Sequence, residues 1–138
     1  MNSTKHFSRL LLIFTLILLS SCIQTITEPE DPIFKEKIDF KMNDVRQQLQ
    51  CSGIGLVGKR ISENGIITKV MEIQILNGKA IHEEKMDSVA KSIAQIVKSS
   101  LTDQNQYMIY KIKFIQKNGS GAITKETWQE ISFPNKNL

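Results

Sequence analysis

An amphipathic stripe between residues 83 and 101 constrains the fold of this chain more than any other feature. Glu83 and Glu84 at its start and Lys98 near its end suit the dipole of a helix. Its apolar residues recur at helical spacing, and they are Met86, Val89, Ala90, Ile93, Ala94, Ile96, Val97 and Leu101. A stripe of this width predicts a long helix that packs one side against a β-sheet.

The sequence predicts a first β-hairpin over residues 54–76. Asn64-Gly65 lies between two β-rich arms, and this dipeptide favours a type I′ turn because both residues tolerate positive φ. A two-residue loop would place Leu56 opposite Ile73 on an apolar face. The other face would then carry polar side chains, and these are Lys59, Glu72 and Gln74.

A second hairpin is predicted over residues 107–133, around Asn118-Gly119-Ser120-Gly121. Its loop has either two or four residues. The shorter loop would place Lys111 opposite Glu126, and the longer one would place it opposite Trp128. Both registers give the same two faces, because a shift of two residues preserves the direction of each side chain.

Residues 38–51 permit two interpretations. Apolar residues at 38, 42, 45 and 49 have helical spacing, whereas those at 38, 40 and 42 alternate as in a strand. We favour a short extended piece followed by a helix from about 44 to 50.

The predicted fold is therefore α+β, with two antiparallel β-hairpins forming a sheet, a long helix (about 83–101) packed on one face, and a short N-terminal helix.

Residues 1–22 have the layout of an export signal. Lys5 and Arg9 precede an apolar run from 10 to 19, which is followed by Leu19-Ser20-Ser21-Cys22. The apolar run is about half of the ~20 residues that a membrane-spanning helix needs. We therefore expect a signal that is cleaved rather than a helix that spans the membrane.

Leu19-Ser20-Ser21-Cys22 resembles the lipobox of bacterial lipoproteins. The resemblance implies a diacylglyceryl group on the Cys22 sulfur, cleavage before Cys22 and acylation of the new amino terminus, for example by palmitate. Ile23, where enteric bacteria use Asp to retain lipoproteins at the inner membrane, implies the outer membrane. The alternatives are an ordinary secretory signal, which would leave Cys22 as a plain thiol, and an uncleaved anchor in the membrane interface.

This interpretation divides the chain into a signal peptide (1–21), a flexible tether (22–37) and a single domain (38–138). The tether is predicted because Pro29 and Pro32 lie among acidic residues with no apolar periodicity. Fully extended, residues 23 to about 35 of it would reach on the order of 40 Å at ~3.3 Å per residue. Such a tether would hold the domain clear of the bilayer.

The charge is uneven along the chain, whose formal net charge is +4. Acidic side chains outnumber basic ones from 22 to 40, and basic ones dominate from 41 onward. An envelope protein with this balance suits acidic glycans, lipopolysaccharide phosphates or an acidic protein partner. Compositional drift in a Lys-rich chain explains the balance equally simply, and nucleic acid is not an expected partner outside the cytoplasm.

Few residues suited to catalysis remain in the predicted mature chain. With Cys22 acylated, Cys51 has no second cysteine for a disulfide, and His82 is the one histidine left after cleavage. No zinc-binding spacing or Gly-rich phosphate loop is present, so we expect no metal, no cofactor and no enzymatic activity. A Cys51–His82 dyad is the one nucleophilic pairing that the composition permits, and a buried thiol is the simpler interpretation.

The predicted partner-binding residues lie on the outward face of the second hairpin. They are Tyr107, Ile109, Lys111, Lys113 and Trp128. Aromatic side chains flanked by charge on an exposed sheet face are typical of a binding patch. Alternatively, a helix or the N-terminal segment covers them.

We therefore expect a lipid-anchored interaction or assembly module of the bacterial envelope, bound to the bilayer through Cys22 and to a protein partner. The order of elements from 38 to about 100 is similar to that of the small domains at the amino end of secretins and of their lipoprotein partners. An inhibitor or immunity protein fits the same size and location. The alternatives are an envelope enzyme using Cys51 or a carboxylate, and a binder of acidic envelope polymers.

Overall fold

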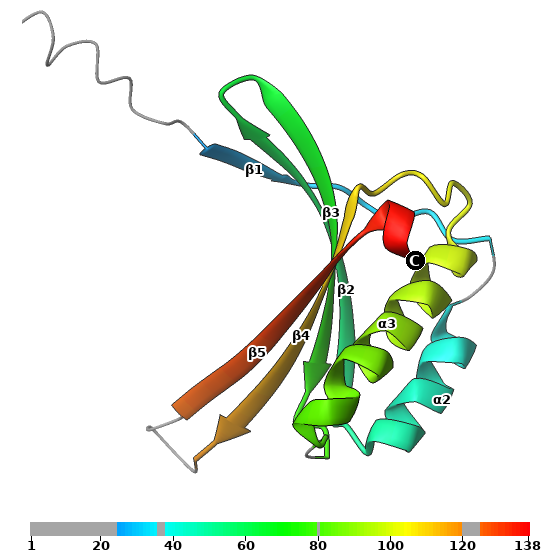
Figure 1. Cartoon of the computed structure of the whole chain (residues 1–138), viewed down its shortest axis with the longest axis vertical. Helices are drawn as coiled ribbons and strands as arrows, with labels where there is room; N and C mark the ends of the chain where they lie inside the picture. Colours follow the sequence, from blue (N-terminus) through cyan, green and yellow to red (C-terminus); the bar gives the residue numbers. More distant parts are fainter. Residues whose placement is uncertain (1–24, 36–37, 80, 120–124) are drawn as a thin grey trace, which may run out of the picture.

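The computed structural model describes residues 25–35, 38–79, 81–119 and 125–138. The predicted signal peptide and Cys22 lie outside these described residues. One sheet has the strand order β1-β2-β3-β4-β5, with both helices on the same side of it (Figure 1). The elements are β1 (Thr25–Pro29), α2 (Asp39–Leu49), β2 (Gly53–Glu63), β3 (Ile66–Leu76), α3 (Glu83–Ser100), β4 (Ile109–Asn118), β5 (Lys125–Pro134) and the 3₁₀ turn η1 (Asn135–Asn137).

The sheet is mixed. The pairs β1–β2, β2–β3 and β4–β5 are antiparallel, whereas β3 and β4 run parallel, with Val70 beside Ile109 and Leu76 beside Ile115. Parallel neighbours need a crossover connection, and α3 provides it between β3 and β4. The two hairpins are therefore joined side by side through their inner strands.

The predicted fold, in which two antiparallel hairpins make the whole sheet, is wrong. The sheet has a fifth strand, β1, and a parallel pair at its centre. β1 forms within the segment predicted as a tether, where Thr25 pairs with Glu63 and Pro29 with Lys59. All of its side chains are exposed, so backbone pairing holds it in place and no apolar periodicity marks it in the sequence.

The register of the first hairpin is confirmed. Leu56 lies opposite Ile73, and Asn64 and Gly65 form the turn with φ angles of 52° and 80°. These positive angles are those that a two-residue hairpin turn demands.

The register of the second hairpin is not the predicted one. Lys111 lies opposite Ser132, rather than opposite Glu126 or Trp128. Pairing ends at Asn118 and Lys125, so the glycine-containing segment belongs to a longer connection, part of which lies outside the described residues. The shift is an even number of residues, and the two faces are therefore those that the sequence predicted.

The extended piece predicted at the start of the domain is also wrong, because α2 already begins at Asp39. Ile38, Met42 and Val45 are buried in the core. The helical spacing of these residues prevails because it places them together against the sheet. As a consequence Phe40, on another side of the helix, is 79% exposed.

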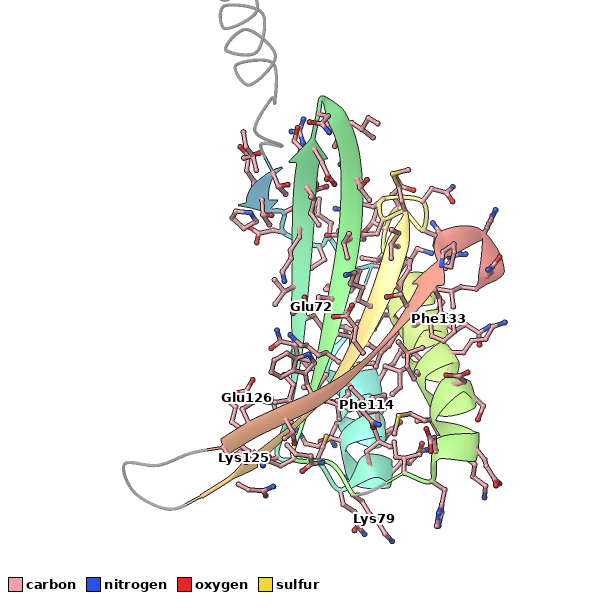
Figure 2. All side chains as sticks on the ribbon, turned by 60° about the vertical axis from the view of Figure 1, so that its left-hand side comes forward. Glu72, Lys79, Phe114, Lys125, Glu126 and Phe133 are labelled. Carbon is pink, nitrogen blue, oxygen red and sulfur yellow. The ribbon has the colours of Figure 1, made fainter. Side chains whose placement is uncertain are left out.

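The core fills the space between the helices and the sheet. α3, which agrees with the helix predicted from residues 83–101, buries Ala90, Ile93, Ala94 and Val97 there. The strands contribute Met71, Ile73, Ile75, Tyr110, Ile112 and Phe114. Figure 2 shows Phe114 and Phe133 on the side of the sheet that α3 covers.

Gly58 permits a close approach on this side of the sheet. A Cβ atom at Gly58 would lie 2.0 Å from the Glu30 carbonyl oxygen and 2.3 Å from the Tyr107 hydroxyl oxygen. The Glu30 amide donates to the Gly58 carbonyl oxygen at 2.9 Å, and the Tyr107 hydroxyl donates to the Glu30 carbonyl oxygen at 3.2 Å. A glycine is needed here because the chain leaving β1 crosses directly over β2.

Candidate functional site

The side of the sheet opposite α2 and α3, called here the outer face, carries the candidate site. No helix or strand of the described ranges covers it (Figure 1). Alternation along the strands places one set of side chains on this face. Its central members are Val57, Lys59, Glu72, Gln74, Lys111, Lys113, Trp128 and Glu130.

Trp128 is the large aromatic residue of the outer face. It is 58% exposed, although it lies in the middle region of a strand opposite the buried Ile115. The Lys113 Nζ atom lies 5.0 Å from the centroid of its ring, within the range of a cation–π interaction. The indole ring is thus supported by the sheet and by Lys113 while much of its surface remains open to solvent.

Two ion pairs cross the centre of the outer face. Lys59 pairs with Glu72 at 2.5 Å, and Lys111 pairs with Glu130 at 3.1 Å. Among the described residues, Lys113 is not within ion-pair distance of a carboxylate. The positive charge of Lys113 is therefore directed at the Trp128 ring and at whatever approaches the face.

Glu72 is a nearly buried carboxylate at the centre of the outer face (Figure 2), with only 9% of its side chain exposed. Gln74 Nε2 donates to its second carboxylate oxygen at 2.6 Å. Burial favours the neutral form of Glu72, but hydrogen bonds from Lys59 and Gln74 and the positive charges of Lys59 and Lys113 outweigh burial and lower its pKa. Glu72 therefore holds a fixed negative charge that organises the lysines around it.

The structure places four of the five predicted binding residues, Ile109, Lys111, Lys113 and Trp128, on the outer face. Tyr107 is not there, because it is fully buried on the helix side, where its hydroxyl donates to Glu30. Burial and the charges of Glu30 and Asp31 raise its pKa to about 12. The alternation used to place Tyr107 begins only at Ile109, the first residue of β4.

The contribution of the first hairpin to this site was missed. Lys59, Glu72 and Gln74 carry a visible signal, since alternation alone puts them on the polar face of that hairpin. What the sequence did not indicate is that β3 pairs with β4, which puts Glu72 beside Lys111. The site thus spans both hairpins rather than one.

Two of the molecule's hollows lie beside the helices. A groove of about 740 Å³ runs between α2 and β2 and includes Phe40, Met42 and Leu56 in its lining. A second hollow of about 490 Å³ lies where α3 begins, near Phe114 and Lys79 (Figure 2). Both are open and have mixed polar and apolar linings; the groove includes one acidic and one basic side chain, Asp39 and Arg46, and the second hollow is also lined by Trp128.

Cys51 and His82, the pair considered for nucleophilic chemistry, lie in different surroundings. Cys51 is a free, buried cysteine of the core, and His82 is the exposed residue that precedes α3. Within the described ranges, no hydrogen bond joins them and no group of three or more His, Cys, Asp or Glu side chains could hold a metal ion.

No described helix is long and apolar enough to cross a membrane. Comparisons with protein-family models, curated proteins and solved structures found no match to this chain.

Proposed function

We propose that this chain is a non-enzymatic interaction module of a bacterial envelope that docks a protein partner through its outer face. The observation that carries the proposal is Trp128, which is 58% exposed and lies under Lys113 on a sheet face that no described element covers. Tryptophan is enriched among the residues that contribute most to protein–protein binding. A rigid ring that is already held in place loses little conformational entropy when a partner covers it.

The charges around Trp128 indicate the kind of partner. Lys59, Lys111 and Lys113 face two carboxylates, those of Glu72 and Glu130. The three lysines therefore exceed the two carboxylates by one positive charge, and Lys113, which is in neither ion pair, lies next to the exposed Trp128 ring. A partner that presents an acidic side chain beside an apolar contact would complement this arrangement.

The envelope location in this proposal rests on Cys22, which lies outside the described residues. Leu19-Ser20-Ser21-Cys22 resembles a lipobox, and a diacylglyceryl group would supply two acyl chains, enough for stable membrane attachment. Ile23 favours the outer membrane. Intact-mass analysis of the natural protein tests this part directly, since an unmodified Cys22 would contradict it.

Site-specific photo-crosslinking tests the docking face. A benzophenone amino acid at Ser132, on the outer face, should crosslink one partner in intact cells, and Trp128→Ala should abolish that crosslink. The matched control is the same probe at Gln95, an exposed residue of α3, which should give no such product. Crosslinking from Gln95 but not from Ser132 would contradict the proposal.

The melting temperature of the Trp128→Ala variant decides whether a loss of crosslinking reflects a lost partner contact or a loss of stability. If Trp128 is a contact residue, Trp128→Ala should leave the melting temperature nearly unchanged, because the ring is largely exposed. Trp128→Phe should retain part of the crosslinking, because it keeps an aromatic surface for Lys113 and the partner. A large fall in melting temperature with Trp128→Ala would show that the ring serves packing instead.

A further inference from the structure

Three isoleucines are exposed at one end of the sheet, Ile26 and Ile67 on one face and Ile66 on the other, and this end is called here the isoleucine tip. Ile26, Ile66 and Ile67 are 47%, 72% and 42% exposed. Ile26 and Ile67 both lie beside Ser62 in the sheet, and Ile66 follows the Asn64-Gly65 turn directly. In Figure 1 the start of β1 and the β2–β3 turn lie at the same end of the molecule, beyond both helices.

An apolar tip is not a general property of the hairpins in this protein. The last paired residues of the other hairpin are polar, with Asn118 opposite Lys125 and an ion pair between Lys117 and Glu126 at 3.4 Å. Exposed β-branched residues at a hairpin turn invite unwanted association unless another surface covers them. Within the described residues, this other hairpin end, called here the polar tip, lacks the exposed isoleucines of the isoleucine tip.

The predicted lipid anchor is close to this tip in the sequence. Only two residues separate Cys22 from Thr25, the first residue of β1. Thr25 pairs with Glu63, which precedes the hairpin turn. Because three residue steps span at most ~10 Å, an acyl group on Cys22 would enter the bilayer close to Ile26, Ile66 and Ile67.

We propose that the isoleucine tip inserts into the apolar edge of the lipid bilayer next to the acyl chains on Cys22. The inference rests on the proposed lipid anchor and extends it from a tether to a fixed orientation. Exposed Glu28 and Glu63 lie at the same end as exposed Arg60, so apolar burial rather than attraction to anionic lipids drives the contact. The tip therefore binds zwitterionic and anionic bilayers alike.

This orientation connects the membrane to the docking face. Trp128 lies beside Ile115, Ile115 beside Leu76, and Leu76 beside Gly53. Gly53 is the end of β2 farthest from the tip, and β2 has 11 residues. At ~3.3 Å per residue, the sheet holds Trp128 on the order of 30 Å from the bilayer surface.

Lipid quenching of a fluorophore tests the proposal. The lipidated full chain, carrying Cys51→Ala and Ile66→Cys labelled with nitrobenzoxadiazole, is reconstituted into phosphatidylcholine vesicles containing doxyl-labelled acyl chains. The matched control carries the label at Glu126→Cys, at the polar tip. We expect at least twofold stronger quenching at 66 than at 126, and the same ratio when phosphatidylglycerol replaces half of the lipid.

Substitutions within the tip separate insertion from mere proximity to the anchor. Ile67→Ser should reduce quenching at 66 by at least half, whereas Ile33→Ser, at an exposed isoleucine outside the tip, should leave it unchanged. Vesicle flotation and intact mass report the anchor independently. Equal quenching at 66 and 126 in a chain that is acylated and floats would overturn the tip contact alone, and an unacylated chain that does not float would overturn both the anchor and the tip contact.

Discussion

The two faces of the central strands bury their residues by different means. Ile73 and Glu72 are neighbours on β3, with 0% and 7% of their surface exposed. Ile73 is enclosed by apolar side chains of the helices and strands, whereas Glu72 is enclosed by the polar side chains of Lys59, Gln74 and their neighbours. Burial in the middle of a sheet therefore does not by itself identify the core. We expect substitutions on the helix side to change mainly stability, and substitutions on the outer face to change mainly charge and binding.

The largest expected difference is between two isoleucines of β4. Ile112→Ala should lower the free energy of unfolding by about 3–4 kcal/mol, because it leaves a cavity in the packed core. Ile115→Ala, at a residue that is also buried but lies on the outer face, should cost about 1–2 kcal/mol because Trp128 and water can fill the space. Urea unfolding of both variants measures the difference, and equal losses would remove the distinction between the faces.

Two glycines of β2 provide a matched pair on opposite faces. Gly58→Ala should cost about 2–3 kcal/mol, because its Cβ would lie 2.0 Å from the Glu30 carbonyl oxygen and would push the chain after β1 off the sheet. Gly55→Ala should be neutral or stabilise by about 0.5 kcal/mol, because its nearest neighbour, Gln74 Oε1, is at an ordinary distance of 3.5 Å. Thermal melts of the two variants suffice, and a neutral Gly58→Ala would show that Glu30 does not pack where the structure places it.

The charge of Glu72 should make part of the stability depend on pH. Its folded-state pKa is lowered from the ordinary value of 4.5, so its stabilising contribution is present above pH 4.5 and is lost as the pH falls through the lower, folded-state value. Glu72→Gln should cost about 1–2 kcal/mol at pH 7, because Lys59 loses its charged partner. The difference from the unsubstituted protein should shrink in unfolding experiments below pH 4. A difference that is constant with pH would mean that the carboxylate is not charged in the folded state.

Among the substitutions expected to destabilise the protein, Trp128→Ala should have the smallest effect. With 58% of its surface exposed, the side chain should contribute no more than about 0.5 kcal/mol to the free energy of unfolding. Differential scanning calorimetry of Trp128→Ala and of Ile112→Ala allows their losses of stability to be compared directly. A loss comparable with that of Ile112→Ala would place Trp128 among the packing residues.

Local patterns predicted the elements whose side chains alternate between two environments. The helix at 83–101 and the pairing of Leu56 with Ile73 were visible because one side of each element is apolar. β1 was not visible, because its five residues are all exposed and only backbone pairing defines it. The parallel pairing of β3 with β4 depends on how α3 crosses the sheet, which no local pattern reports.

The candidate site was predicted in part for the same reason. Lys111, Lys113 and Trp128 follow from alternation along β4 and β5. Tyr107 was misplaced because it precedes β4, where alternation does not apply. Glu72 could not be joined to the site from sequence, since its neighbour Lys111 belongs to a distant part of the chain.

The parallel pairing at the centre of the sheet also governs the order in which the molecule can assemble. Each hairpin closes locally, but Val70 can meet Ile109 only after α3 has formed and crossed the sheet. An isolated two-stranded hairpin is at best marginally stable in water. Cutting the chain between β3 and α3 would divide the single core, because α3 and β3 both contribute to it, so we expect each half to be less stable than the whole. We expect the joining of the two halves to be the slow step of folding, because it pairs strands that are far apart in the sequence, and the sheet of a chain that emerges from its N-terminus stays incomplete until residues 109–118 have followed.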